Sequence, residues 1–212
     1  MENKVLICIG RKSGSGGRKI GLAVAERLGI PCYDKELIQK VAEKSGLAPE
    51  VIATHDEVPS KSFLYSIVMG SHTSFHSGNV ELPIEQRIFL AQYNTIKELA
   101  EEGSAVFVGR CADYALLEDE NLITIFIGCD DKDAVSHIQE TYGFTLQKAK
   151  DYIKKTNKRR SSYYNYYTTK EWGDSDNYDL CINRSRLGFE GTIDLIVKYI
   201  EERVKAESKK SE

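Results

Sequence analysis

The sequence of 212 residues lacks any apolar run that approaches the ~20 residues needed to cross a bilayer. It also lacks a strong excess of either charge, since its formal net charge is −3 at pH 7. The residues before the first apolar segment do not resemble a secretory signal. These absences predict a cytoplasmic protein that binds neither a nucleic acid nor a membrane, and they leave its oligomeric state open.

The sequence also lacks the cysteine and histidine patterns that bind metals. Its five cysteines are scattered and form no CxxC pair, and His55, His72 and His76 do not follow a metal-ligand spacing. We therefore interpret the cysteines as packing residues in a reducing compartment and the histidines as solvated loop residues. No protein ligand of a metal ion is assigned from the sequence.

Buried strands and amphipathic helices alternate along the chain. Strands are predicted at 5–9, 105–108, 122–127 and 178–182, and helices at 20–28, 84–100, 192–204 and from Leu146 onward. This alternation is typical of a parallel sheet between two helix layers. It predicts an α/β fold with three layers, α/β/α, and a mostly parallel sheet. One domain is expected over 1–205, followed by a flexible polar tail at 206–212.

One segment does not fit this pattern. Residues 60–83 are rich in serine, glycine and histidine and show no clear period. A connection of this length is either a functional lid or a disordered segment, and both interpretations stay open.

A glycine-rich loop joins the first strand to the first helix, over Gly10 to Arg18. Glycines permit positive φ, so successive backbone amides can converge on one anion, and the helix that follows adds its positive end. Four cations lie within nine residues: Arg11, Lys12, Arg18 and Lys19. A flexible turn is the alternative, but the position between strand and helix favours phosphate binding. The predicted ATP-binding residues are Ser13, Gly14, Ser15, Gly16, Gly17, Arg18 and Lys19.

The loop departs from the usual phosphate-binding pattern, GxxxxGK[ST], in which the lysine contacts the β- and γ-phosphates and the hydroxyl binds Mg²⁺. Gly16 is followed by Gly17 and then Arg18, so we predict that Arg18 takes the lysine's role as a planar fork. An arginine or lysine then occupies the Ser/Thr position. The magnesium hydroxyl is left unassigned, with Ser13 or Ser15 as possible substitutes.

Three ordered blocks of the sequence together resemble the cytidylate kinase-like family. They are IGRKSGSGGRKIGLAVAERLGIPCYDKELI from Ile9, VFVGRCADYAL from Val106, and NKRRSSYYNYYTTKEWGDSDNYDLCINRSRLG from Asn157. The resemblance covers most of the chain and is weak over 50–83. It implies a P-loop NTPase-like fold with an acceptor-binding insertion, approximately 34–83, and a helical LID, approximately 145–172.

The resemblance also implies residues that hold the phosphate acceptor. The aspartate and arginine that follow the first helix in cytidylate kinases fall on Asp34 and Lys40. The Gly-Arg pair of the second block places Arg110 at the acceptor phosphate, after a buried strand, where ligands bind in α/β sheets. Two structural alternatives remain: Asp34 caps the helix expected at 35–42, and Arg110 forms a surface salt bridge.

The third block carries a basic cluster in the LID. Its members are Lys154, Lys155, Lys158, Arg159 and Arg160. The resemblance implies that Arg159 and Arg160, together with Arg18, stabilise charge on the transferring group, and that Asn157 and Arg160 contact the acceptor. The alternative is simple compensation of a helix dipole at a carboxyl end. The tyrosine-rich run at 163–167 is interpreted as packing in preference to stacking on a nucleobase.

These observations predict a phosphotransferase that moves the γ-phosphate of ATP, with Mg²⁺, to a nucleoside monophosphate. CMP or dCMP is the first candidate by resemblance. Such chemistry consists mainly of positioning and charge stabilisation, so no protein nucleophile is required. Two alternatives remain: a kinase of another small-molecule acceptor, and a non-catalytic nucleotide-binding protein with an altered loop.

Overall fold

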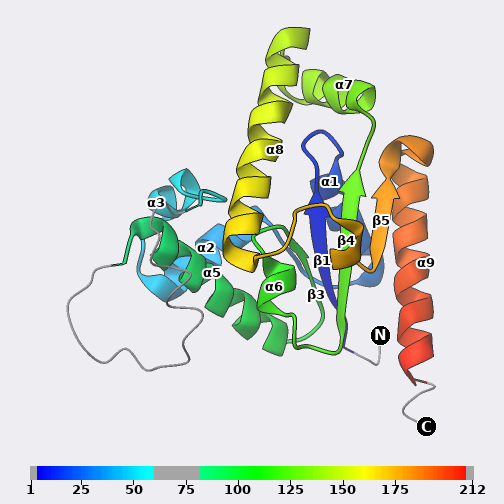
Figure 1. Cartoon of the computed structure of the whole chain (residues 1–212). Helices are drawn as coiled ribbons and strands as arrows, with labels where there is room; N and C mark the ends of the chain where they lie inside the picture. Colours follow the sequence, from blue (N-terminus) through cyan, green and yellow to red (C-terminus); the bar gives the residue numbers. More distant parts are fainter. Residues whose placement is uncertain (1–3, 60–81, 209–212) are drawn as a thin grey trace.

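The computed structural model describes residues 4–59 and 82–208. Within them, five strands form one parallel sheet in the order β2-β3-β1-β4-β5 (Figure 1). The strands are β1 (Leu6–Arg11), β2 (Cys32–Tyr33), β3 (Ala105–Val108), β4 (Leu122–Gly128) and β5 (Leu180–Asn183). The predicted α/β fold with a parallel sheet is confirmed. β2 was not predicted, because a strand of two residues has no readable period.

Helices connect the strands. They are α1 (Gly17–Leu28), α2 (Lys35–Ser45), α3 (Pro49–Thr54), α5 (Ile84–Glu101), α6 (Ala112–Ala115), α7 (Asp131–Tyr142), α8 (Leu146–Thr168) and α9 (Gly188–Ser208). Two short 3₁₀ turns lie at Ser175–Asn177 and Arg184–Arg186. The last helix was expected to end at Val204 but continues to Ser208, and residues 209–212 of the expected tail lie outside the described residues.

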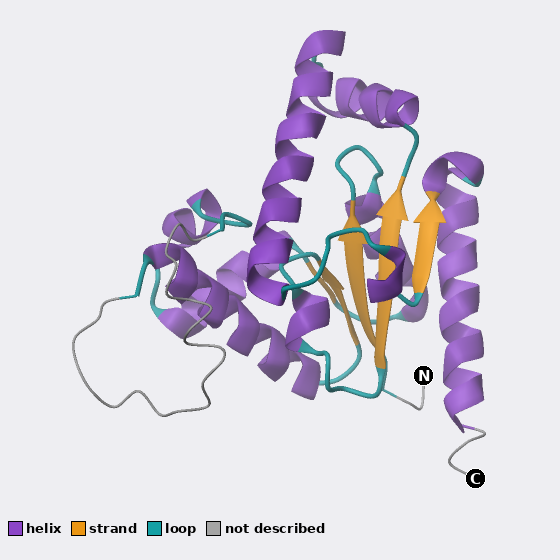
Figure 2. Ribbon diagram, viewed as in Figure 1, coloured by secondary structure: helices purple, strands orange, loops and turns teal. Residues whose placement is uncertain are grey.

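Alternate side chains of each strand point to opposite faces of the sheet, and a layer of helices packs on each face. Ile7, Ile9 and other residues of one face pack against α1 and α9. Leu6, Cys8 and the alternate residues pack against α2, α3, α5 and α6. Figure 2 shows the sheet between these helices. In Figure 1 the arrowheads of β1, β4 and β5 point toward the α7–α8 hairpin. Because all neighbouring strands are parallel, the carboxyl edge of the sheet faces this hairpin.

α8 lies within the segment predicted as a LID, approximately 145–172, and forms a helical hairpin with α7 (Figure 1). Thr145 caps α8 by accepting a hydrogen bond from the backbone amide of Lys148, and the helix then runs without interruption to Thr168. The basic cluster at 154–160 therefore lies in the middle of α8. Dipole compensation at a carboxyl end, the structural alternative, is wrong, because the last turn of the helix carries no basic residue.

The tyrosine-rich run packs, as predicted. Tyr163, Tyr164 and Tyr167 are buried, and the ring of Tyr167 stacks on Phe89 of α5 with centroids 3.9 Å apart. The hydroxyl of Tyr163 donates to the side chain of Gln92 at 3.0 Å. These contacts anchor the C-terminal half of α8 to the body of the protein. The N-terminal half of α8 is therefore held over the carboxyl edge of the sheet.

Other expectations concern parts of the chain that are only partly described. The two interpretations of 60–83 fall almost entirely on residues 60–81, which lie outside the described ranges. Among the helices that are described, none combines the length and the hydropathy required for a membrane span.

Candidate active site

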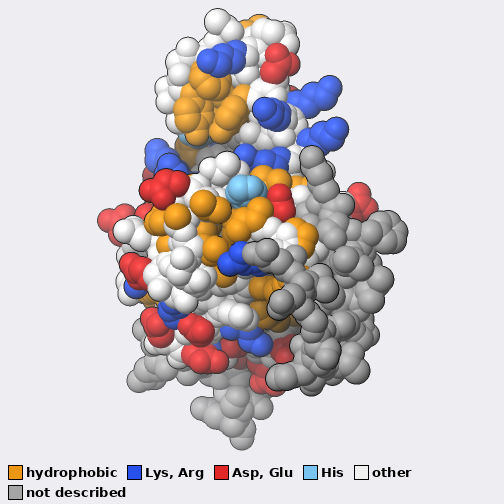
Figure 3. Space-filling model, turned by 90° about the vertical axis from the view of Figure 1, so that its left-hand side faces the viewer, with side chains coloured by type: hydrophobic (Ala, Val, Ile, Leu, Met, Phe, Trp, Pro, Cys, Tyr) orange, Lys and Arg blue, Asp and Glu red, His pale blue; other side chains and the backbone are white. Residues whose placement is uncertain are grey.

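A cavity of about 810 Å³ opens at the carboxyl edge of the sheet. Its floor is the glycine-rich loop and Arg110, one wall comes from α2 and α3, and the opposite wall comes from α7 and α8. In the space-filling view, the hairpin projects above the body, and Lys and Arg side chains gather where the two meet (Figure 3). Ligands of open α/β sheets bind in this position.

The glycine-rich loop forms a tight turn between β1 and α1. Gly14 and Gly16 have φ of 82° and 73°, in the left-handed region that glycine adopts without strain. The buried hydroxyl of Ser15 donates to the carbonyl of Lys12 at 2.8 Å and accepts from the amide of Gly17 at 3.2 Å. The amides of Arg18 and Lys19, in the first turn of α1, have no intrahelical carbonyl to bond. The turn therefore presents amides and a helix amino end to the cavity.

Neighbouring elements pack closely on these glycines. A Cβ on Gly14 would lie 2.7 Å from the backbone of Ala134 in α7, and a Cβ on Gly16 would lie 2.3 Å from the ring of Phe189 in α9. Such distances are below van der Waals contact. The loop is thus clamped between α7 and α9, and only glycine fits at these two positions.

Gly16→Ala is expected to destabilise the protein by about 2–5 kcal/mol, because the alanine adds left-handed strain and collides with Phe189. Gly143→Ala is the matched control, since Gly143 has a similar φ of 66° but no atom within 4 Å of the added Cβ. It should cost only the strain, about 1–2 kcal/mol. Urea denaturation of both variants measures the difference, and equal losses would contradict the packing described for Gly16.

The LID contacts the loop directly through Asn157. The backbone amide of Ser13 donates to Oδ1 of Asn157 at 2.7 Å. Asn157 does not line the main cavity; it faces the groove between α7 and α8. The side chain predicted to contact the acceptor thus bonds the phosphate-binding loop in this structure.

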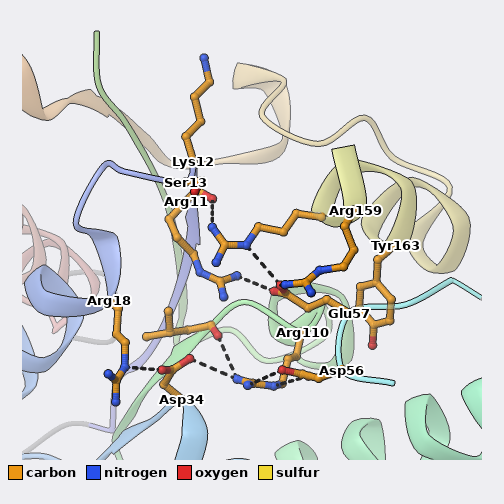
Figure 4. A network of polar contacts seen from close by, with 12 residues as sticks. Arg11, Lys12, Ser13, Arg18, Asp34, Asp56, Glu57, Arg110, Arg159 and Tyr163 are labelled. Atoms are coloured by element: carbon orange, nitrogen blue, oxygen red, sulfur yellow. Dashed lines mark hydrogen bonds and ion pairs between the residues drawn. The ribbon is translucent and has the colours of Figure 1, made fainter. Parts of the chain in front are cut away.

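A buried carboxylate lies at the centre of the site (Figure 4). Glu57, 5% exposed, accepts a hydrogen bond from Arg11 at 2.7 Å and one from Arg160 at 3.2 Å, and Arg159 approaches it at 3.9 Å. Burial alone would raise the pKa of Glu57, but the charges of Arg11, Arg160 and Arg110 outweigh it and hold that pKa well below its usual range. Glu57 is therefore ionised and gathers arginines from β1 and α8 at one point.

A second ion-pair group lies beside the first, on the β2–α2 side. Arg110 donates from Nε and Nη2 to the two carboxylate oxygens of Asp56, both at 2.8 Å, and from Nη1 to Asp34 at 3.3 Å. Arg18 pairs with the other oxygen of Asp34 at 2.5 Å. Burial would lower the pKa of Arg110, yet the carboxylates of Asp56, Glu57 and Asp34 raise it above its ordinary value. The fork geometry gives Arg110 and Asp56 two parallel charge-assisted hydrogen bonds.

Two of these charged residues have unusual backbones. Glu57 and Arg110 both have φ of 54°, in the left-handed region that residues with a Cβ rarely adopt. Such conformations cost about 1–3 kcal/mol each and concentrate at functional sites. The surrounding ion pairs hold both residues in place.

The structure brings most, but not all, of the predicted residues to the cavity. Asp34 lines it through ion pairs and makes no side-chain capping bond to α2 among the described residues, so the capping alternative is wrong. Arg110 is buried, so a surface salt bridge is also wrong. Lys40 is exposed and does not line the cavity, whereas Lys35 of the same helix does. The ammonium of Lys19 lies 4.7 Å from the centroid of the Phe189 ring, and Lys19 does not line the cavity.

Sequence reasoning missed three charged residues of the site. Arg11 was noted only as one of four loop cations, and Asp56 and Glu57 were not noted at all. The available signal was the acidic pair itself, which His55 separates from the end of α3 and Val58 separates from Pro59. Without its partners, such a pair is indistinguishable from a solvated turn.

The side chains of the cavity do not match a Mg²⁺ ligand set. The hydroxyl of Ser15 is engaged within the loop, and Asp34, Asp56 and Glu57 are each paired with arginine. The described ranges, 4–59 and 82–208, contain no group of three or more His, Cys, Asp or Glu arranged to hold a metal ion. Of the two serines proposed for the magnesium hydroxyl, Ser15 has one acceptor lone pair left beside its two bonds, and Ser13 lines the cavity.

Comparison with known proteins identifies the family. The model of the cytidylate kinase-like family matches residues 6–186, which span every strand of the sheet and the whole cavity. The chain belongs to the cytidylate kinase-like family. Membership agrees with the glycine-rich loop and the parallel sheet of this cytidylate kinase-like protein. A search of curated proteins gave no match.

Solved structures with similar folds include several kinases. An uncharacterized protein from Eubacterium ventriosum ATCC 27560 is 30% identical, with a TM-score of 0.71 over 93% of this chain and 99% of that one. Shikimate kinase from Bacteroides thetaiotaomicron is 15% identical, with a TM-score of 0.55 over 94% and 99% of the two chains. A gluconokinase from Sinorhizobium meliloti 1021 is 11% identical, with a TM-score of 0.51 over 99% and 98%. The two kinases establish likeness of fold alone.

Proposed function

We propose that this protein transfers the γ-phosphate of ATP to a small-molecule acceptor, with CMP or dCMP as the first acceptor to test. The observation that carries the proposal is the convergence of an amide-lined loop and three arginines on one cavity at the carboxyl edge of the sheet. Phosphoryl transfer requires little more than positioning and stabilisation of negative charge. This arrangement supplies both.

The cavity has two ends with different chemistry. The loop from Ser13 to Lys19 and the amino end of α1 form the donor end, where the amides and the helix dipole favour a triphosphate. Asp34 and Arg110 lie at the other end, beside Lys35 and Gln39 of α2, which we assign to the acceptor. Arg18 stands between the two ends, bound to Asp34.

The LID supplies charge to the group in transit. Arg160 extends from α8 to Glu57, and its Nη1 donates to the carbonyl of Arg11 at 3.2 Å, at the root of the loop. Arg159, half exposed on the same turn, also lines the cavity. We assign both to the transferring phosphoryl group, where they stabilise charge and help exclude water. P-loop kinases generally use ATP with Mg²⁺, and here the ion is expected to arrive on the nucleotide phosphates.

A second acceptor class is favoured by one observation. All three nitrogens of the Arg110 guanidinium already donate to carboxylates: Nε and Nη2 to Asp56, and Nη1 to Asp34. Carboxylate oxygens accept hydrogen bonds from hydroxyl groups and repel phosphate. A polyhydroxylated small molecule, in place of a nucleoside monophosphate, therefore also fits the acceptor end.

A coupled assay of ADP formation tests the proposal. The protein is incubated with ATP and Mg²⁺ and with each member of a panel: CMP, dCMP, UMP, AMP, shikimate, gluconate and simple sugars. We expect one class of acceptor to raise ADP formation well above the rate without acceptor, and CMP or dCMP to lead the nucleotides. Folded protein that binds ATP but turns over no acceptor would favour the non-catalytic alternative.

A further inference from the structure

The glycine-rich loop admits two alignments with GxxxxGK[ST]. If Gly17 is the second glycine, Arg18 stands at the lysine position. If Gly16 is the second glycine, the lysine position holds Gly17 and the first glycine position holds Arg11. In the second alignment a glycine and a cation have exchanged positions relative to the common pattern. The cation, Arg11, stands at the end of β1, and the glycine, Gly17, is the first residue of α1.

The geometry supports the second alignment. Gly16 adopts the left-handed conformation and immediately precedes α1, of which Gly17 is the first residue. A Cβ on Gly17 would lie 2.6 Å from the Cβ of Arg11 and 3.1 Å from its Cγ. The side chain of Arg11 therefore begins in the space where the side chain of residue 17 would begin. The two positions cannot both carry a side chain in this arrangement.

A second glycine makes room for the other end of the same side chain. A Cβ on Gly109, after β3, would lie 1.9 Å from Nη1 of Arg11 and 3.0 Å from Oε1 of Glu57. Arg11 thus passes over Gly17 and places its guanidinium against Gly109, where Glu57 holds it. The side chain is 9% exposed and lines the main cavity.

Arg18 points elsewhere. Figure 4 shows Arg18 directed to Asp34 and Arg11 directed to Glu57. Arg11 and Arg160 are joined through the carbonyl of Arg11 and through Glu57. The loop cation that meets the LID is therefore Arg11.

We propose that Arg11 contacts the terminal phosphates of the donor in place of the usual P-loop lysine, and that Gly17 is the compensating change. The inference rests on the proposed function in one respect, which is that the donor is ATP. The position of the bound phosphates beside Arg11 does not depend on it. It replaces the sequence-based assignment of this role to Arg18. An arginine offers two parallel donors to a phosphate, where a lysine offers a point charge.

Calorimetric titration with Mg·ATP and with inorganic tripolyphosphate tests the inference on four variants. Arg11→Gln is expected to lose about 10- to 100-fold in affinity for both ligands, because it removes charge-assisted bonds to phosphate. Arg18→Gln should lose less. Arg11→Gly should bind as weakly as Arg11→Gln, and Arg11→Gly with Gly17→Lys, which restores the common pattern, should recover most of the affinity.

Three results would overturn the inference: Arg11→Gln binding as well as the wild type, Arg18→Gln losing more than Arg11→Gln, or the double variant binding no better than Arg11→Gly. Failure of the wild type to bind either ligand overturns it as well. Tripolyphosphate binding that depends on Arg11, in a protein that phosphorylates no acceptor, upholds the inference and rejects the proposed function.

If Arg11→Gln does not fold, a second measurement replaces it. The Nε–H signal of Arg11 in the ¹H–¹⁵N spectrum of the wild type is assigned by its loss in Arg11→Lys, which keeps the charge beside Glu57. Titration with tripolyphosphate is expected to shift this signal at the same concentrations that saturate binding. An unmoved signal at saturation rejects the contact.

Discussion

Replacing Arg160 by glutamine is expected to lower kcat by about 10³-fold or more, because arginines that contact the transferring phosphoryl group contribute on this scale. Arg160 lies in the middle of α8, where its side chain is 17% exposed and reaches both Glu57 and the carbonyl of Arg11. Glutamine has a similar helix propensity, so α8 should persist. Steady-state kinetics with the best acceptor of the panel measure the effect.

The loss should fall on kcat more than on KM, since the charge that Arg160 meets develops during transfer. Lys155→Gln is the matched control, because Lys155 is exposed on the same helix and does not line the cavity. It should leave kcat essentially unchanged. A change in KM alone for Arg160→Gln would mean that this arginine only binds substrate, contrary to the assigned role.

Arg160 is charged at neutral pH. Burial and the neighbouring charge of Arg11 lower the pKa of Arg160, and the carboxylate of Glu57 opposes this shift. A guanidinium keeps its proton in proteins, so Arg160 carries a positive charge for the group in transit.

Replacing Glu57 by glutamine is expected to destabilise the protein by about 3–5 kcal/mol, the range for removing one partner of a buried ion pair. The variant leaves Arg11 and Arg160 buried without the carboxylate that compensates both. Denaturant unfolding at neutral pH measures the loss. Glu50→Gln, on the exposed surface of α3, is the control and should change stability by about 0.5 kcal/mol or less.

The sign of the pH effect follows from the lowered pKa of Glu57. A carboxylate with a lowered folded-state pKa contributes its full stability above its ordinary pKa of about 4.3, and this stability is lost as the pH falls further toward the folded-state value. The stability difference between wild type and Glu57→Gln should thus be constant from neutral pH to about pH 5 and shrink in more acidic solution. A difference that grew on acidification would contradict the ion-pair account.

The fold could be predicted largely from the sequence because its central strands and first helix carry strong, local patterns. β1, β3 and β4 are continuous apolar runs, and α1 is bounded by Gly16 and Gly29. Elements with weak patterns were missed or cut short. α7 buries only Ala134 and Ile138, and α8 is polar through its middle, so hydrophobic spacing does not reveal their extent.

The candidate site was predictable where its residues are neighbours in sequence. The loop from Ser13 to Lys19 is one local motif, and glycine and charge suffice to find it. The ion-pair network is not local, because 46 residues separate Arg11 from Glu57 and 103 separate Glu57 from Arg160. Lys40 was assigned by its position in the family motif alone. That assignment took no account of which face of α2 each residue occupies, and in the structure Lys35 lines the cavity whereas Lys40 is exposed.

The central claim is that the γ-phosphate of ATP moves to an acceptor in this cavity, and ³¹P NMR of the reaction mixture tests it most directly. With wild-type protein, ATP, Mg²⁺ and the acceptor panel, the account predicts that the γ-phosphate signal declines while a phosphorylated-acceptor signal and ADP grow in equal amounts. Arg160→Gln should show neither change on the same timescale. Appearance of inorganic phosphate alone, or an unchanged γ-phosphate signal with protein that binds ATP, would contradict the account.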